Sequence, residues 1–265
     1  MANNSLDLGS IKVSVLGDGT FVTDAGNLFG KGSRQKIKGA MHPVLVTTDE
    51  ALVLLDAGFG PELPEYMEGR YELDRDKNLM DHLKEAGYTA EDITHVVLSH
   101  LDADHVGWAL DPPSFPNATV YVQEAALEEG REMSEGDGRR EAVPAVEKGV
   151  GEGWCELLDG NTEIVQGLRV EVRSGHSEGH QISWMESGDG AALFSADLAP
   201  ARIWLNPDLV GGTESDPEAS RKNRIEVLTE AEERNVPVIL YHEPQNFLVT
   251  ICKTEDGFEG EPWEG

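Results

Sequence analysis

Ten residues, from Ser99 to Trp108, constrain the fold of this chain more than any other stretch. The apolar run at residues 93–98 comes directly before them and has the length and β-branched content of a buried strand. The stretch reads SHLDADHVGW and holds two histidines and two aspartates, which are His100, Asp102, Asp104 and His105. Imidazole and carboxylate groups at this density after a strand are typical of a metal site. The alternative is an acidic turn with solvated histidines.

Four further motifs follow a recognisable order along the chain. They are LLDAG at 54–58, GHSEGH at 175–180, FSAD at 194–197 and YHEP at 241–244. Together with SHLDADHVGW they resemble the motifs of the metallo-β-lactamase superfamily. The superfamily's His-x-His-x-Asp-His signature is present here with Asp102 where the second histidine usually stands. The chain between Tyr71 and His105, and the residues after Ser195, resemble the lactonase-like hydrolases of that superfamily.

The resemblance implies an α+β fold, the four-layer αββα sandwich, in a single domain over residues 1–265. It places the metals at one edge, between the two sheets. The residues themselves indicate two series of strands, each followed by helices, which is compatible with this fold but does not select it. Strands are expected at 11–16, 43–48, 51–55, 93–98, 119–122, 155–158, 163–165, 168–173, 181–186, 191–196, 236–241 and 247–253, and helices at 76–87, 123–129 and 217–234. For residues 130–153, a helical cap beside the site is one interpretation.

The resemblance also implies two divalent metal ions and a ligand set for them. One metal is expected on His100, Asp102 and His176, the other on Asp104, His105 and His242, with Asp197 bridging the two. Zinc is the expected metal. Iron and manganese are alternatives, because the carboxylate of Asp102 is a harder ligand than imidazole. The alternative for Asp102 is that it points away from the site.

Three residues are expected behind the ligands. The resemblance implies that Asp56 hydrogen-bonds the loop that carries His100, with Ser99 beside it. Outer carboxylates of this kind orient metal-bound imidazoles. His180 lies four residues after His176, a spacing that also binds zinc when the segment is helical. Glycines at 175 and 179 argue against a helix, so we expect a structural role for His180.

Residues 17–41 read as a long, glycine-containing connection, and loops of that length in a compact domain are usually functional or mobile. Four basic residues cluster there, namely Lys31, Arg34, Lys36 and Lys38. We interpret them as a substrate-binding rim that meets an anionic group. A solvated turn is the alternative.

The function implied by the resemblance is that of a metal-dependent hydrolase. A metal-bridged hydroxide would cleave a lactone or another ester, and Asp104 would accept a proton and orient the hydroxide. No Gly-x-Ser-x-Gly nucleophile motif is present. The alternatives are an iron-dependent redox enzyme of the same fold, a phosphodiesterase, and a protein that holds metal without turnover.

The charge of the chain is unusual, because 50 acidic residues stand against 21 basic ones for a net charge of −29. The acids are spread along the chain, which predicts a charged surface and a salt-adapted organism. An ordinary acidic protein is the alternative. The first residues show neither a basic start nor an apolar run, so we expect a cytoplasmic protein without a membrane partner. A nucleic-acid partner is not expected, and the oligomeric state stays open.

Overall fold

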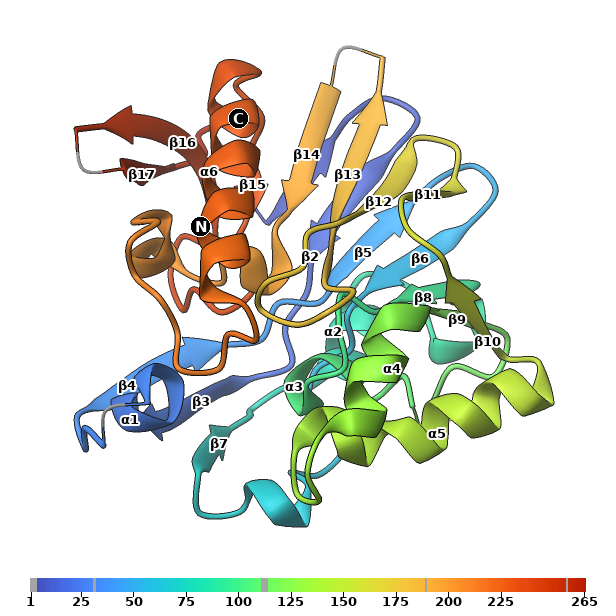
Figure 1. The fold of residues 1–265 in the computed structure, drawn as a ribbon. Helices are drawn as coiled ribbons and strands as arrows, with labels where there is room; N and C mark the ends of the chain where they lie inside the picture. The colour runs from blue at the N-terminus through green and yellow to red at the C-terminus, as the bar shows by residue number, and fades with distance from the viewer. Residues whose placement is uncertain (1–3, 31, 111–113, 189, 256) are drawn as a thin grey trace.

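The structure is a computed structural model that describes residues 4–30, 32–110, 114–188, 190–255 and 257–265. Two seven-stranded sheets form its centre (Figure 1). The first sheet has the order β1 (Ser5–Asp7), β2 (Lys12–Val15), β5 (Val44–Thr47), β6 (Leu52–Leu55), β8 (His95–Val97), β9 (Thr119–Gln123) and β10 (Cys155–Leu158). The second has the order β11 (Thr162–Val165), β12 (Leu168–Val172), β13 (Gln181–Ser187), β14 (Gly190–Phe194), β15 (Val238–Ile239), β16 (Leu248–Thr254) and β17 (Gly257–Pro262).

Each sheet combines antiparallel and parallel pairs. Parallel pairing joins β6, β8, β9 and β10 in the first sheet, and β14 with β15 in the second. The other neighbours are antiparallel, as hairpins and meanders require. The carboxyl ends of β6, β8, β14 and β15 lead into the segments that carry the histidine and aspartate motifs. The parallel strands therefore deliver these motifs to one edge of the molecule.

The helices are α1 (Ala25–Phe29), α2 (Leu79–Glu85), α3 (Ala103–Val106), α4 (Glu124–Glu132), α5 (Gly138–Glu152) and α6 (Pro217–Glu233), with short 3-10 helices η1 (Glu65–Met67), η2 (Ala90–Asp92), η4 (Ala196–Leu198) and η5 (Arg202–Leu205). Of these, α2, α4, α5 and α6 cover the two outer faces, and the others are shorter. Local sequence explains where two of them begin. Asn78 and Asp81 form a capping box at α2, and Asp216 caps α6, where Pro217 fits the first turn.

Three groups of buried apolar side chains define the layers. One lies between the sheets and joins residues such as Val46 and Val53 to Val170 and Phe194. The second packs the first sheet against α2, α4 and α5. The third packs the second sheet against α6. This αββα layering confirms the predicted fold, and Figure 1 shows α6 on one side and α4 and α5 on the other.

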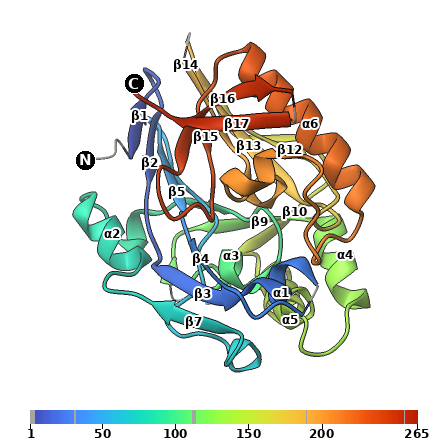
Figure 2. The ribbon, with the colours of Figure 1, turned by 90° about the vertical axis from the view of Figure 1, so that its left-hand side faces the viewer.

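The prediction of an irregular connection at residues 17–41 is wrong. The chain there forms β3 (Thr20–Asp24), α1 and β4 (Lys36–Ala40), and β7 (Tyr71–Asp74) completes a small antiparallel sheet in the order β4-β3-β7. Figure 2 shows this sheet beside α1, below the two large sheets. Alternation such as buried Phe21 and Thr23 between half-exposed neighbours marks β3 as a strand, but the glycines on either side obscured it.

Other elements differ less from the boundaries predicted from the sequence. The helix expected at 76–87 begins later, at Leu79, and the segment 130–153 is largely helical, as α5. The short strands β1, β7 and β17 were not anticipated. In the described residues, no helix combines the length and the apolar character needed to cross a membrane.

Candidate metal centre

The candidate ligands meet at the edge where the two sheets expose their carboxyl ends. His100, Asp102, Asp104 and His105 follow β8, Asp197 follows β14 and His242 follows β15. His176 lies in the loop before β13. Segments separated by more than a hundred residues thus place seven side chains around one small volume.

The distances divide this set into two groups that share Asp197. Its Oδ2 lies 3.5 Å from Nε2 of His176 and 4.0 Å from Nε2 of His100. Asp102 faces the same two imidazoles, with Oδ2 3.1 and 3.3 Å from their Nε2 atoms.

The other oxygen of Asp197 faces the second group. Its Oδ1 lies 3.3 Å from Nε2 of His242 and 3.4 Å from Nε2 of His105. Asp104 lies 3.4 Å from His242 and 3.9 Å from His105. The ligand atoms lie within 4.8 Å of one another in each of three sets: His100, Asp102 and His176; Asp104, His105 and His242; and His100, His105 and Asp197.

Three atoms at this site fit metal ligation because they lack another partner. Among the described residues, the buried atoms without a hydrogen bond include Nε2 of His100, Nε2 of His105 and Oδ1 of Asp197, and also Nδ1 of the neighbouring His180. Burying polar atoms unpaired costs free energy, so such atoms call for an explanation. Nitrogen and carboxylate donors suit zinc, and three or four of them per ion match its preferred coordination. The residues present therefore fit two divalent ions.

Hydrogen bonds set the tautomers of three imidazoles. Nδ1 of His242 donates to the carbonyl of Ala40 at 2.8 Å, and Nδ1 of His105 to Asp56 at 2.7 Å. Nδ1 of His100 lies 2.9 Å from Oγ of Ser99, which itself donates to Asp56 at 2.7 Å, so His100 donates to Ser99. When each ring is neutral, Nε2 is left with a lone pair facing the site, as ligation requires.

Asp56 lies behind the ligands, where the sequence placed it. Its Oδ1 accepts from the backbone N–H of Ser99 at 2.7 Å, and it adopts a φ of +56°. Aspartate tolerates this left-handed conformation better than most residues. Gly107 lets the two loops touch, because a Cβ there would lie 1.9 Å from the backbone of Phe59. The turn after β6 is therefore locked against the loop after β8.

His180 lies next to the ligands but is turned differently. Its Nε2 accepts a hydrogen bond from the backbone N–H of Asp197 at 3.2 Å. Burial, and then the nearby imidazoles of His100 and His176, hold the pKa of His180 well below its usual value. A neutral ring with its lone pair already used agrees with the structural role expected for it.

Separate substitutions of His176 and His180 test whether His176 is a metal ligand and His180 is not. We expect His176→Ala to lower the bound metal by about one ion per chain, because the first group loses an imidazole. His180→Gln should keep the full metal content, because the amide oxygen can still accept from the backbone of Asp197. Metal analysis of both purified variants checks this, and a large loss of metal in His180→Gln would contradict it.

Carboxylates dominate the electrostatics of the metal-free site. Burial lowers the pKa of His105, but Asp197, Asp56 and Asp104 raise it more, to about 10. His105 therefore carries a proton at neutral pH when no metal is present. That positive charge occupies the place that a metal ion would take.

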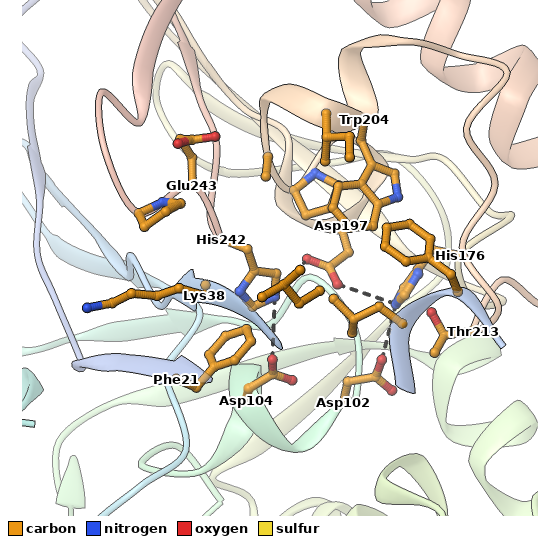
Figure 3. Close-up of a pocket in the computed structure, with 18 of the residues that line it drawn as sticks. Phe21, Lys38, Asp102, Asp104, His176, Asp197, Trp204, Thr213, His242 and Glu243 are labelled. Atoms are coloured by element: carbon orange, nitrogen blue, oxygen red, sulfur yellow. Dashed lines mark hydrogen bonds and ion pairs between the residues drawn. The ribbon is translucent and has the colours of Figure 1, made fainter. Parts of the chain in front are cut away.

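A mostly apolar pocket of about 440 Å³ opens onto the ligands. Figure 3 shows Asp102, Asp104, His176, Asp197 and His242 on one side of it. The remaining wall comes largely from apolar side chains on the small sheet, α1 and η5, namely Phe21, Leu28, Phe29, Ile37, Tyr71, Ile203 and Trp204. The rings of Phe29 and Trp204 stack at 5.3 Å across the pocket wall. The pocket can hold an apolar group beside the charged cluster.

The structure describes three of the four basic residues of the predicted rim, and these three lie in different surroundings. Lys38 lines the pocket, although Figure 3 shows its amino group pointing away from the carboxylates. Lys36 is exposed and pairs with Glu72 at 3.0 Å and with Asp24 at 3.4 Å. Arg34 is exposed on the connection before β4, and Lys31 lies outside the described residues.

Several residues at the site were missed by the sequence reasoning. The hydroxyl of Tyr241 donates to the carbonyl of Asp104 at 2.7 Å, and its ring stacks on His105 at 4.2 Å. Arg139, on α5, donates to Asp102 at 2.7 Å. Tyr241 stands beside a motif histidine and could have been noticed. Nothing in the local pattern distinguishes Arg139 from Arg140.

Comparison with known proteins agrees with the geometry. The sequence model described as the Metallo-beta-lactamase superfamily matches residues 42–242. This chain belongs to the metallo-β-lactamase superfamily. The match includes every candidate ligand, from the stretch after β8 to His242.

Similar proteins indicate to which branch of the superfamily the chain belongs. The N-acyl homoserine lactonase AiiA of Bacillus thuringiensis subsp. kurstaki is 26% identical over 213 residues, which are 74% of this chain and 78% of AiiA. A probable metallo-hydrolase of Mycobacterium tuberculosis is 29% identical over 180 residues, 59% of this chain and 56% of that protein. The chain is thus a metal-dependent hydrolase of the lactonase branch, as its motifs predicted.

Solved structures show the same fold. AidC, a dizinc quorum-quenching lactonase in complex with a product, superposes with a TM-score of 0.82 at 21% identity, over 98% of this chain and 97% of AidC. A probable metal-dependent hydrolase from Staphylococcus aureus reaches a TM-score of 0.84 at 22% identity, over 98% of this chain and 99% of that one.

Proposed function

We propose that this chain binds two divalent ions, zinc by preference, and hydrolyses a lactone or another carboxylic ester with an apolar acyl chain. The observation that carries the proposal is the apolar pocket, which opens directly onto five of the seven candidate ligands, with His100 and His105 buried behind them. The relatives named above support the substrate class, because AiiA and AidC are lactonases.

The residues have distinct tasks in this proposal. His100, Asp102 and His176 hold one ion, Asp104, His105 and His242 hold the other, and Asp197 joins them. Two such ions, when bound, lower the pKa of a water molecule and polarise the carbonyl oxygen of the substrate.

Asp104 has the further task of moving a proton. Its carboxylate is at the pocket and only partly exposed, and its backbone carbonyl is held by Tyr241. Such a carboxylate can accept a proton from the attacking water and pass it to the leaving oxygen as the ring or ester opens. The backbone contact keeps it in place while it does so.

The apolar wall positions the acyl chain. Phe21, Phe29 and Trp204 offer ring faces close to the ligands, and burying an acyl chain against them favours binding by about 0.8 kcal/mol for each CH₂ group. The wall also excludes water from the side of the pocket opposite the carboxylates. A substrate with a longer acyl chain should therefore bind more tightly.

Truncating Trp204 tests the assignment. In a panel of N-acyl homoserine lactones, we expect Trp204→Ala to raise KM by about 10-fold for long acyl chains and much less for short ones. Val150→Ala, which changes an exposed apolar residue of α5 away from the pocket, is the control. An equal rise in KM at every chain length would contradict an acyl-binding wall. Failure of the unaltered enzyme to open any lactone or ester would overturn the proposed function.

We also propose adaptation to high salt, which the net charge of −29 supports. Repulsion between acidic side chains destabilises the compact state, and salt screens it. The melting temperature should rise by about 5 °C or more between dilute buffer and molar potassium chloride. An unchanged melting temperature would contradict this.

A further inference from the structure

Arg139 is a buried arginine in direct contact with a candidate ligand. It stands in the first turn of α5, and only 5% of the residue is exposed. Arginine is almost never buried so fully unless its charge is paired. Its main partner is Asp102, the ligand that replaces the usual second histidine of the motif.

Every N–H group of the guanidinium has an acceptor. Nε donates to Oδ1 of Asp102 at 2.7 Å. Nη1 donates to Oγ of Ser215 at 2.9 Å and to Glu129 at 3.3 Å. Nη2 donates to the carbonyl of His176 at 3.1 Å and to Oδ2 of Asp102 at 3.4 Å. A lysine, with three donors on a point charge, could not make this set of contacts.

The contact with Arg139 gives the two carboxylate oxygens of Asp102 different surroundings. Arg139 makes its short contact, 2.7 Å, with Oδ1 and a longer one, 3.4 Å, with Oδ2. Oδ2 is the oxygen that faces the imidazoles, at 3.1 Å from Nε2 of His176 and 3.3 Å from Nε2 of His100. An imidazole at position 102 would likewise present one ligand atom.

The pairing also changes the charge around the first metal position. Asp102 brings one negative charge that an imidazole would not, and Arg139 brings one positive charge to within hydrogen-bonding distance of it. Glu129 shares the guanidinium, but from its far side, where Ser215 also donates to Glu129 at 2.6 Å. Arg139 thus separates Glu129 from the ligands.

We propose that Arg139 is a positioning residue that makes Asp102 a single-atom, charge-balanced ligand and thereby sets the metal preference of the first site. This inference rests on the proposed two-metal site. Without Arg139, Asp102 could turn both oxygens to the metal and carry its full charge. Such a site is harder and favours higher coordination numbers, which suits manganese better than zinc.

Arg139→Gln is therefore expected to lower the preference for zinc over manganese by about 10-fold or more, since partners of metal ligands change metal affinity on that scale. With cobalt(II) in the site, the visible absorption should weaken, because a higher coordination number gives weaker d–d bands. Glu129→Gln should act in the opposite direction and raise the zinc preference, because Asp102 is then the remaining carboxylate that pairs with Arg139. Arg140→Gln, on the same helix but outside the site, is the matched control.

Making Arg139→Gln in a second parent protein, Asp102→His, distinguishes an effect on the position of Asp102 from a general effect on protein stability. In Asp102→His, an imidazole stands at position 102 and needs no positive partner. Arg139→Gln should then leave the zinc preference and the cobalt spectrum unchanged. The coupling between the two substitutions is measured by a double-mutant cycle.

The experiment measures competitive zinc and manganese binding and the cobalt(II) spectrum in each of these proteins. Equal shifts on Arg139→Gln in both backgrounds would overturn the proposal, and so would an unchanged or lower zinc preference in Glu129→Gln. If Arg139→Gln does not fold, the zinc preference of Glu129→Gln tests the proposal instead. Metal content of the unaltered protein is measured first, because failure to bind metal there contradicts the proposed function rather than the role of Arg139.

Discussion

Asp197→Asn is expected to remove most of the bound metal and at least about three orders of magnitude of esterase or lactonase activity. Each oxygen of Asp197 faces a different group of imidazoles, with Oδ2 toward His176 and Oδ1 toward His105 and His242. An amide can offer only one oxygen and no charge, so it cannot bridge. Loss of the several kcal/mol that metal ions contribute to the transition state corresponds to this change in rate.

Two measurements check the effect of Asp197→Asn. Metal analysis gives the ions per chain, and kcat/KM on a lactone gives the loss of transition-state stabilisation. Asp208→Asn, at an exposed aspartate that pairs with Arg221, is the control and should match the unaltered protein. Retention of full metal content and activity in Asp197→Asn would show that the residue does not bridge.

Asp56→Asn is expected to weaken metal binding by about 10- to 100-fold, as loss of an outer carboxylate does. Asparagine tolerates the left-handed backbone at this position, so the substitution tests charge and not backbone strain. The amide cannot serve His105 and both donors of Ser99 as the carboxylate does. The substitution therefore loosens the orientation of two candidate ligand imidazoles, His105 directly and His100 through Ser99.

The same substitution has a pH-dependent effect on the metal-free protein. The folded-state pKa of His105, about 10, lies above the ordinary histidine value of 6.5, so the buried ion pair contributes fully below about pH 6.5 and is lost as pH rises through about 10. Breaking such a buried pair costs about 3 to 5 kcal/mol. Denaturant unfolding with chelator present should show a large deficit for Asp56→Asn at neutral pH and a smaller one at pH 10. Asp49→Asn, at an exposed aspartate, is the control, and a deficit independent of pH would contradict the ion pair.

Most motif residues were predictable because they follow a strand that its own sequence marks. Apolar runs at 93–98 and 236–241 identified β8 and β15, and the residues after them had to lie at a sheet edge. A structural role for His180 was expected from its flanking glycines, because they disfavour the helix that would turn both histidines to one metal. The family resemblance supplied the pairing of the two sheets, which periodicity does not determine.

The pocket wall and Arg139 were not predictable in this way. Phe29 and Trp204 come from segments far apart in the chain, and only the folded arrangement stacks them. Arg139 belongs to a charged, glycine-rich segment without a clear apolar period, so its burial depends on partners elsewhere: Asp102, Glu129 and Ser215. The pocket wall and Arg139 are placed by tertiary contacts, whereas the candidate ligands come from local motifs.

Metal stoichiometry tests the central claim most directly. The purified chain, reconstituted with zinc and freed of excess by gel filtration, is analysed by inductively coupled plasma mass spectrometry against protein concentration. The two groups of ligands joined by Asp197 predict a ratio close to two zinc ions per chain. A ratio that remains at one or below after reconstitution would contradict the account.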